Sequence, residues 1–135
     1  MTAHRLDLSV YYEDTDMAGI VYYANYLKYI ERGRTEALNA LGIDQLTLKA
    51  EAGLVFVVRW VGIDYLIPAK FGDRLTVATV IGRVRGASID MMQEVQRGDQ
   101  ALIRASVTLA CMDDAGRPQR LPDAIRLKLA AAAAS

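Results

Sequence analysis

Three carboxylates stand close together in the segment Glu13-Asp14-Thr15-Asp16, shortly before a stretch whose apolar residues recur at helical spacing. The start of a helix offers unpaired backbone N–H groups and the positive end of the helix dipole. Such groups can polarise a carbonyl oxygen and stabilise the oxyanion that forms when the carbonyl is attacked. A carboxylate at the same place can act as a general base or as a nucleophile, although acidic residues before a helix are also common caps.

The helix that must position this segment is predicted to start at Tyr23 and to run for about 18 residues. Gly42 follows the last apolar residue of the stripe and is a suitable stop. Gly33 lies in the helix interior, where glycine costs roughly 1 kcal/mol relative to alanine. Its presence predicts that another part of the chain packs closely against the helix there. Residues 44–52 are interpreted as irregular or helical.

The rest of the chain is dominated by strand patterns. Strands are predicted at residues 5–12, 54–67, 75–81, 89–95 and 103–111. Segment 54–67 is apolar almost throughout, so we expect both faces of this strand to be covered. Arg97-Gly98-Asp99-Gln100 is interpreted as a hairpin turn. Near the C-terminus, Leu121-Pro122-Asp123 favours the start of a helix, whereas the apolar alternation that follows favours a strand.

These elements predict a single α+β domain over residues 1–135, in which a five-stranded antiparallel sheet curls around one long helix. A chain of 135 residues, of which 53% are hydrophobic, is long enough to bury one substantial core. Only the alanine-rich tail, at about residues 130–135, is of low complexity.

Charge and composition argue against several classes of protein. The chain has 16 basic and 16 acidic side chains, and a formal net charge of zero argues against nucleic acid as a partner. No apolar run approaches the roughly 20 residues of a membrane span, and the first residues lack the apolar region of a signal peptide. The single cysteine, Cys111, excludes an internal disulfide framework and fits a reducing compartment. We therefore expect a cytoplasmic protein.

Other candidate chemistry is poorly supported. His4 is the only histidine and sits near the N-terminus, so a Ser-His-Asp or Cys-His mechanism lacks a base. Cys111 falls on the apolar face of a predicted strand and is interpreted as a small buried hydrophobe. Glu13, Asp14 and Asp16 do not match a recognised cation-binding loop, so no metal is expected.

Residues 11–36, YYEDTDMAGIVYYANYLKYIERGRTE, resemble the signature of the hotdog-fold acyl-CoA thioesterases. The most similar types are the 4-hydroxybenzoyl-CoA thioesterases and the Tol–Pal-associated acyl-CoA thioesterases. The shared motif is D-x-D-x-x-G-x-V-[YW]-[YH]-x-x-Y, and the similarity continues through FVVRWVGIDYLIPAKFGD to cover about residues 5–125. The resemblance implies a hotdog fold and an enzyme that hydrolyses acyl-CoA to a free acid and coenzyme A. Coenzyme A is then part of the substrate, and no cofactor is expected.

The resemblance also assigns residues. Asp16 matches the catalytic aspartate of the family, and Tyr23 would contribute its backbone N–H to the thioester carbonyl. The Tol–Pal-associated type usually has histidine at the position of Tyr23, whereas the hydroxybenzoyl type has tyrosine. Arg85 and Ser88 belong to the turn, residues 83–88, that approaches the nucleotide phosphates of coenzyme A in relatives.

Members of the family dimerise and build their sites at the interface, so a homodimer or homotetramer is expected. Two other functions stay open, namely a non-catalytic scaffold of the same fold that binds acyl thioesters and a thioesterase that acts on acyl-carrier-protein. The presence of Asp16 favours an enzyme over a scaffold. The residues leave open whether Asp16 activates water or attacks the thioester carbon itself.

Overall fold

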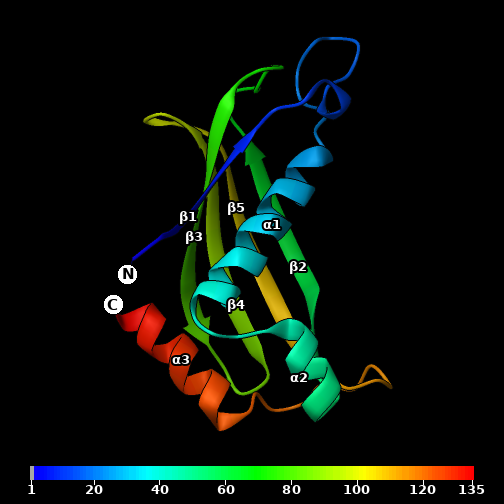
Figure 1. The fold of residues 1–135 in the computed structure, drawn as a ribbon, viewed down its shortest axis with the longest axis vertical. Coiled ribbons are helices and arrows are strands. Elements are labelled where there is room, and N and C mark those ends of the chain that lie inside the picture. Colours follow the sequence, from blue (N-terminus) through cyan, green and yellow to red (C-terminus); the bar gives the residue numbers. More distant parts are fainter. Residues whose placement is uncertain (1) are drawn as a thin grey trace.

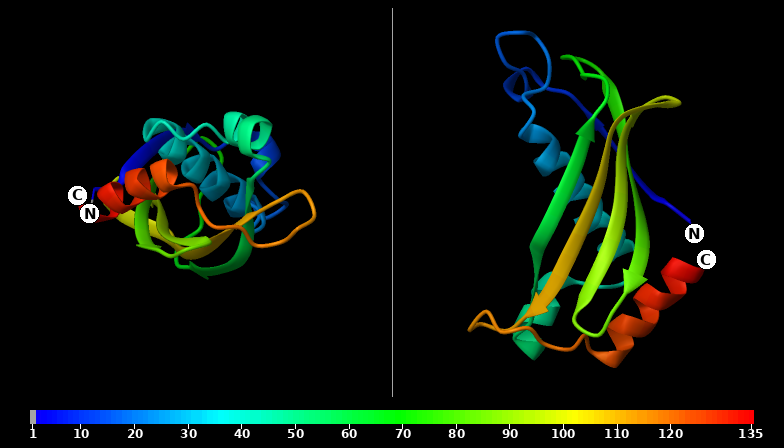
Figure 2. Two further views of the ribbon diagram at one scale, coloured as in Figure 1. Left: turned by 90° about the horizontal axis from the view of Figure 1, so that it is seen from below. Right: turned by 180° about the vertical axis from the view of Figure 1, so that it is seen from behind.

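The computed structural model describes residues 2–135 and shows a five-stranded antiparallel sheet with a long helix, α1, against its concave face (Figure 1). The strands are β1 (His4–Ser9), β2 (Val55–Tyr65), β3 (Arg74–Val84), β4 (Ser88–Arg97) and β5 (Gln100–Met112). The helices are α1 (Asn25–Ala40), α2 (Gln45–Ala52) and α3 (Asp123–Ala134), with a short 3₁₀ turn at Tyr12–Asp14. The predicted α+β class is confirmed, and α2 and α3 lie at one end of the sheet (Figure 2).

The strand order is β1-β3-β4-β5-β2, so β2 returns to pair with β5 at the edge opposite β1. Strands β3, β4 and β5 follow one another as antiparallel neighbours. Between β4 and β5, Arg97 pairs with Gln100 and Gly98 has a φ of +61°, which confirms the predicted tight turn. The order makes β2 an edge strand, and its outer backbone edge has no neighbouring strand within residues 2–135.

Helix α1 begins at Asn25 rather than at Tyr23, because Tyr23 and Ala24 form a turn before it. The helix ends at Ala40, and Gly42 follows with a φ of +76°, which confirms the predicted stop. Its buried residues are Tyr26, Tyr29, Ile30, Gly33, Arg34, Ala37 and Leu38. This face packs on β1, β3 and β4, so α1 covers the side of the sheet that lies nearest β1.

The C-terminal segment forms the helix α3, so the helical interpretation holds and the strand interpretation is wrong. Leu129 is buried and Leu127 is 71% exposed, as expected for residues two positions apart on a helix that packs one face against β3. Residues 45–52 form α2, and the Asp44 side chain caps this helix by accepting from the Leu46 N–H at 3.0 Å.

The prediction that β2 is covered on both faces is wrong for the single chain. Val58, Val61 and Tyr65 pair with buried residues of β5 and point to the same face, yet they are 47%, 37% and 48% exposed. The physical reason is the position of α1, which packs on β1, β3 and β4 and leaves the inner face of β2 open. A groove of about 590 Å³ remains between α1 and β2, with Leu27 and Ile30 in its helix wall.

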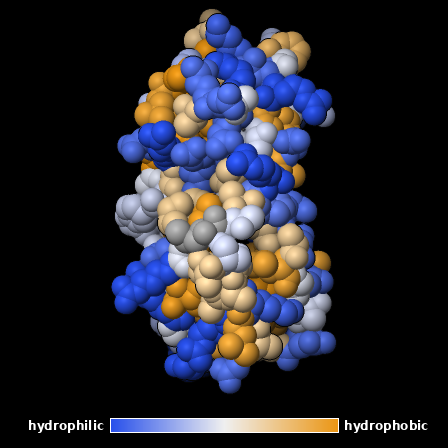
Figure 3. Space-filling view, turned by 90° about the vertical axis from the view of Figure 1, so that its left-hand side faces the viewer, coloured by the Kyte–Doolittle hydropathy of each residue, from blue (hydrophilic) through white to orange (hydrophobic). Residues whose placement is uncertain are grey.

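On the side that carries β1 and the chain termini, apolar and polar residues are interspersed (Figure 3). Among residues 2–135, no helix combines the length and the apolar character needed to cross a membrane.

Gly33 is the point of closest approach between α1 and the sheet. A Cβ placed on this residue would lie 2.5 Å from Val77 Cγ1 and 3.1 Å from both Thr79 Oγ1 and Gln93 Nε2. The sequence-based expectation of close packing at Gly33 is therefore confirmed, because no larger residue fits without movement of the sheet or the helix.

We expect Gly33→Ala to destabilise the fold. Overpacking of this kind costs about 1–3 kcal/mol, and it opposes the gain of about 1 kcal/mol that alanine brings to a helix interior. Urea unfolding measures the balance. Asn39→Ala, at an exposed position of the same helix, is the matched control and should be neutral or slightly stabilising. A Gly33→Ala protein more stable than wild type would contradict the tight contact.

Candidate active site

The acidic loop enters helix α1 through a short antiparallel bridge between Thr15 and Val21. Inside this bridge the Asp16 N–H donates to the Ile20 carbonyl at 3.0 Å, and the Gly19 N–H donates to the Asp16 carbonyl at 2.9 Å. Gly19 has a φ of +77°, a left-handed conformation that glycine adopts without a steric penalty. The loop is therefore a closed turn that fixes the backbone of Asp16.

The Asp16 side chain is exposed and only partly engaged. Its Oδ1 accepts from the Ala18 N–H at 2.9 Å. Its second oxygen, Oδ2, meets no donor within residues 2–135. A carboxylate that is oriented through one oxygen and open at the other has the form needed for a general base or a nucleophile.

Asp14, two residues earlier, has a bracing role. Its Oδ2 accepts from the Tyr11 N–H at 2.8 Å. Its backbone carbonyl accepts from the Tyr22 N–H and from Asn25 Nδ2, both at 2.9 Å. These bonds tie the loop to the start of α1 and brace the backbone two residues before Asp16.

The start of α1 supplies free backbone donors. The Asn25 N–H donates to the Tyr22 carbonyl at 2.8 Å, whereas the N–H groups of Tyr23 and Ala24 meet no acceptor within residues 2–135. Ala24 precedes the first helical residue and offers no side-chain cap. Two unpaired N–H groups therefore stand at the positive end of the helix dipole, where an oxyanion is stabilised.

Tyr65 also belongs to this end of the molecule, although no sequence signal marked it. Its hydroxyl donates to the Tyr23 carbonyl at 3.1 Å, and the two rings lie 6.2 Å apart. The rings of Tyr22 and Tyr23 lie 4.9 Å apart. Proximity to Tyr23 raises the pKa of Tyr22, and burial raises the pKa of Tyr65, so both hydroxyls stay protonated at neutral pH. The pairing of β2 with β5 is what brings Tyr65 to Tyr23 across 42 positions of sequence.

The turn between β3 and β4 holds Arg85 and Ser88. The Arg85 N–H donates to the Ser88 carbonyl at 2.8 Å and closes the turn. The Arg85 guanidinium pairs with Asp90 at 2.8 Å, and Asp90 also accepts from the Thr108 hydroxyl at 3.0 Å. The hydrogen bond from Arg85 holds the pKa of Asp90 below its ordinary value. Ser88 is only 5% exposed, so its backbone carbonyl is the part that contributes to the turn.

Arg120 is a further cation at this turn, and the sequence did not reveal it. The Leu121 N–H donates to the Gly86 carbonyl at 2.8 Å, which lays the segment before α3 along the turn. Arg120 Nη1 lies 3.8 Å from the place that a side chain at Gly86 would occupy. Unlike Arg85, Arg120 has no ion pair within residues 2–135. The proximity of Arg120 to Gly86 depends on the path of the whole of β5, which no local sequence pattern encodes.

The predicted site residues lie at opposite ends of the molecule (Figure 1). Asp16 and Tyr23 lie at the end where α1 begins, whereas the β3–β4 turn with Arg85 lies at the other end, near α3. The single chain thus has Asp16 and Tyr23 at one end and Arg85 at the other.

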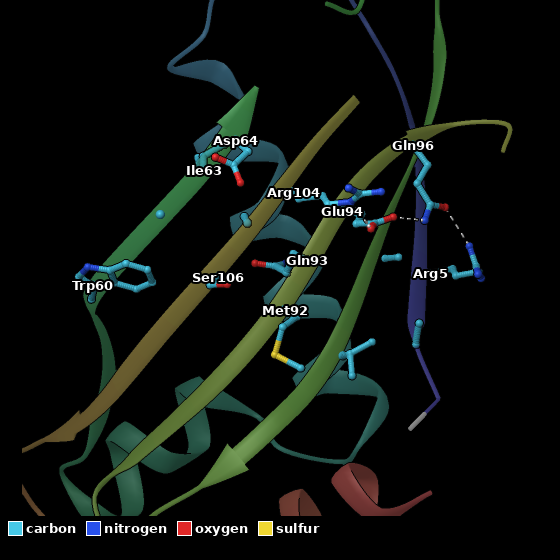
Figure 4. Close-up of a pocket in the computed structure, with 15 residues that line it drawn as sticks. Arg5, Trp60, Ile63, Asp64, Met92, Gln93, Glu94, Gln96, Arg104 and Ser106 are labelled. Atoms are coloured by element: carbon cyan, nitrogen blue, oxygen red, sulfur yellow. Dashed lines mark hydrogen bonds and ion pairs between the residues drawn. The ribbon is translucent and has the colours of Figure 1, made fainter. Parts of the chain in front are cut away.

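A separate hollow of about 720 Å³ lies on the outer face of the sheet (Figure 4). Small residues such as Gly62 and Ser106 line it, and Glu94 and Arg104 form an ion pair of 3.1 Å at its edge. Neither the acidic loop nor the start of α1 contributes to it. We therefore assign the candidate active site to the loop and the helix start, and not to this hollow.

The carboxylates of the acidic loop diverge. That of Asp14 faces the Tyr11 N–H, and that of Asp16 faces the Ala18 N–H. In the part of the chain that the structure describes, no three His, Cys, Asp or Glu side chains are grouped as metal ligands would be. The chemistry that this end can supply is a polarised carbonyl beside an oriented carboxylate.

The model of the thioesterase-like superfamily matches residues 10–129 of the chain. The chain belongs to this superfamily. It is 47% identical over 104 residues to the acyl-CoA thioesterase YbgC of Haemophilus influenzae, which covers 77% of this chain and 76% of that protein. It is 38% identical over 126 residues to the acyl-CoA thioester hydrolase YbgC of Escherichia coli O6:H1, with coverage of 92% and 93%. A crystal structure of a probable thioesterase from Bartonella henselae superposes with a TM-score of 0.86 at 39% identity, and covers 90% of this chain and 100% of that one.

Membership confirms the family that residues 11–36 predict, the hotdog-fold acyl-CoA thioesterases. The superposition confirms the hotdog fold, in which the antiparallel sheet wraps around α1. The match spans the acidic loop, the helix start, the β3–β4 turn and Arg120.

Proposed function

We propose that the chain hydrolyses acyl-CoA thioesters and that Asp16 is the reacting carboxylate. The observation that carries the proposal is the pair of unpaired N–H groups at Tyr23 and Ala24, next to the closed turn that orients Asp16. The names of the relatives, acyl-CoA thioesterase and acyl-CoA thioester hydrolase, support the same substrate class.

In this mechanism the thioester carbonyl oxygen lies at the start of α1 and accepts from the Tyr23 N–H. The hydrogen bond and the helix dipole stabilise the negative charge that develops on this oxygen. Asp16 either takes a proton from the attacking water or attacks the carbonyl carbon to form a mixed anhydride, which water then cleaves. Both routes release the free acid and the thiol of coenzyme A, and neither consumes a cofactor.

We expect Asp16→Asn to lower kcat for acyl-CoA by at least about 100-fold, because asparagine is neither a base nor a nucleophile. The substitution keeps an oxygen that can accept from the Ala18 N–H, so the thermal midpoint should stay near that of wild type. Thiol release from a panel of acyl-CoAs measures the effect. Glu13→Gln is the matched control, since the Glu13 side chain is exposed and makes no hydrogen bond within residues 2–135. A folded Asp16→Asn protein that keeps more than about a tenth of kcat would refute the assignment.

We also propose that two copies assemble along β2, either as a dimer or as half of a tetramer. An open strand edge is ordinarily paired or protected, and β2 also exposes Val58, Val61 and Tyr65 on its inner face. A two-fold axis beside β2 reverses one copy relative to the other. That reversal moves Arg85 of the second copy toward the end that holds Asp16, which completes a site that the single chain leaves divided.

A negative charge at the open face of β2 should break this assembly. We expect Val61→Glu to lower the solution mass to the 14.9 kDa of one chain and to remove activity, whereas wild type has at least twice that mass. Leu127→Glu is the control, because Leu127 is 71% exposed on α3 and away from β2. Light scattering gives the masses. Active wild-type enzyme with the mass of one chain would overturn the proposal.

The phosphates of coenzyme A are proposed to bind at the β3–β4 turn. Arg85 belongs to this turn, and Arg120 Nη1 lies 3.8 Å from the place that a side chain at Gly86 would occupy. Ser88 supports this turn through the carbonyl that accepts from the Arg85 N–H. Arg85 already forms an ion pair with Asp90, while Arg120 has no ion pair within residues 2–135. We therefore assign Arg120 the stronger contact with phosphate.

Arg120→Ala should raise KM for acyl-CoA several-fold and leave kcat nearly unchanged, because a phosphate contact is the same in the ground and transition states. The effect should shrink at high salt, where the charges are screened. Thioesters of N-acetylcysteamine, which lack the nucleotide, should not respond. Arg117→Ala is the control, since Arg117 already pairs with Asp113 at 3.1 Å. Equal losses with both kinds of substrate would mean that Arg120 is structural.

A further inference from the structure

Gln93 is a buried amide in β4, only 2% exposed, within the contact between the sheet and α1. Gln93 and its neighbour Glu94 are both among the residues that line the hollow (Figure 4). The polar atoms of the Gln93 side chain bond to the helix side of the sheet. Nε2 donates to the Ile30 carbonyl at 2.8 Å and to the Thr79 hydroxyl at 2.9 Å. Oε1 accepts from the Arg34 guanidinium at 3.2 Å. Both ends of the amide are therefore engaged.

These bonds determine which way the amide points. A guanidinium has no acceptor, so Oε1 must face Arg34 and the two N–H groups must face Ile30 and Thr79. Arg34 is itself 9% exposed, and burial lowers its pKa. Within residues 2–135 no carboxylate pairs with Arg34, so the Gln93 oxygen is the acceptor that holds this buried cation.

The contact fixes where α1 lies on the sheet. Most other buried residues of this helix face are apolar, and apolar contacts are non-directional, so they resist separation of the layers more than sliding. Hydrogen bonds are directional. Gln93 bonds directly to the Ile30 carbonyl, and the missing side chain of Gly33 lets the helix come close enough for this bond. The position of α1 along and about its own axis therefore depends on Gln93, together with Tyr26, whose hydroxyl accepts from the Ala69 N–H at 3.0 Å.

The loop that carries Asp16 is attached at two places. The Asp14 carbonyl accepts from Asn25 Nδ2 at the start of α1, at 2.9 Å, and the second attachment lies outside the helix. The Val21 N–H donates to the Ala69 carbonyl at 2.9 Å, and Ile20 bridges to Lys70, which attaches the loop to the segment between β2 and β3. A shift of α1 along the sheet moves one attachment of the loop relative to the other, so it changes the geometry between the helix start and Asp16. A displacement of about 1 Å is enough to cost roughly 100-fold in rate.

We infer that Gln93 is a positioning residue for thioester hydrolysis. It holds α1 in the position in which the Tyr23 N–H donates to the thioester carbonyl, next to Asp16. The inference rests on the proposed function. Gln93 is buried between the layers and acts through the Ile30 carbonyl.

Three variants separate positioning from simple loss of stability. Gln93→Glu keeps an acceptor for Arg34 but removes both N–H donors. Gln93→Met keeps the approximate size and removes every hydrogen bond. Thr79→Val, the matched control, removes one hydrogen bond of the cluster and keeps the bond from Gln93 to Ile30. If Gln93→Met fails to fold, Gln93→Glu carries the comparison.

We expect both Gln93 variants to lower kcat by at least about tenfold, with KM within about threefold of wild type. The loss should be equal for acyl-CoA and for N-acetylcysteamine thioesters, because the nucleotide plays no part in it. Thr79→Val should keep kcat within about twofold even where its thermal midpoint falls. A folded Gln93→Glu protein that keeps more than half of kcat would overturn the inference. The inference would also be overturned if kcat fell in step with the thermal midpoint in all three variants.

The backbone amide resonance of Tyr23 in ¹⁵N-labelled protein gives a readout that needs no activity. It should move in Gln93→Glu and stay in place in Thr79→Val. An unmoved resonance in Gln93→Glu would reject the positioning role. If wild type releases no thiol from any acyl-CoA, the proposed function fails, while the resonance still reports on the position of α1.

Discussion

Helix α1 reaches the sheet because Gly33 has no side chain at the point where the two layers come closest. A Cβ there would lie 2.5 Å from Val77 Cγ1, so any other residue would push the layers apart. The close approach lets the buried amide of Gln93 bond directly to the helix backbone. The candidate site requires a defined position and direction of the first turn of α1. Both depend on this contact.

The same helix position explains what the single chain lacks. Because α1 packs on β1, β3 and β4, the inner face of β2 stays exposed at Val58, Val61 and Tyr65. Strand β2 ends at Tyr65, whose hydroxyl donates to the carbonyl of Tyr23 in the turn before α1. The cationic turn with Arg85 lies at the far end of the sheet. In the proposed function, one chain therefore holds two separated parts of the site, and the proposed second copy pairs along the exposed edge of β2.

Sequence alone was enough for features that depend on local rules. The helical period of α1, the left-handed glycine Gly42 after it and the tight turn at Gly98 each follow from the preferences of a few neighbouring residues. The glycine inside α1 predicted close packing because its cost to the helix needs a compensating reason. Asp16 and Tyr23 could be named together because both belong to one short motif.

Tertiary structure alone decided the features that depend on residues far apart in the chain. The pairing of β2 with β5 makes β2 an edge strand, although its own residues are apolar enough for a covered one. Packing against β3 makes the C-terminal segment a helix despite its alternating pattern. Tyr65 reaches Tyr23 through the path of β2, and Arg120 reaches the β3–β4 turn through the path of β5. A residue's own neighbours in sequence carry no information about such contacts. The different surroundings of Asp14 and Asp16 also come from geometry, because the Asp14 backbone carbonyl accepts from the Tyr22 N–H and from Asn25 Nδ2, whereas the Asp16 side chain is exposed.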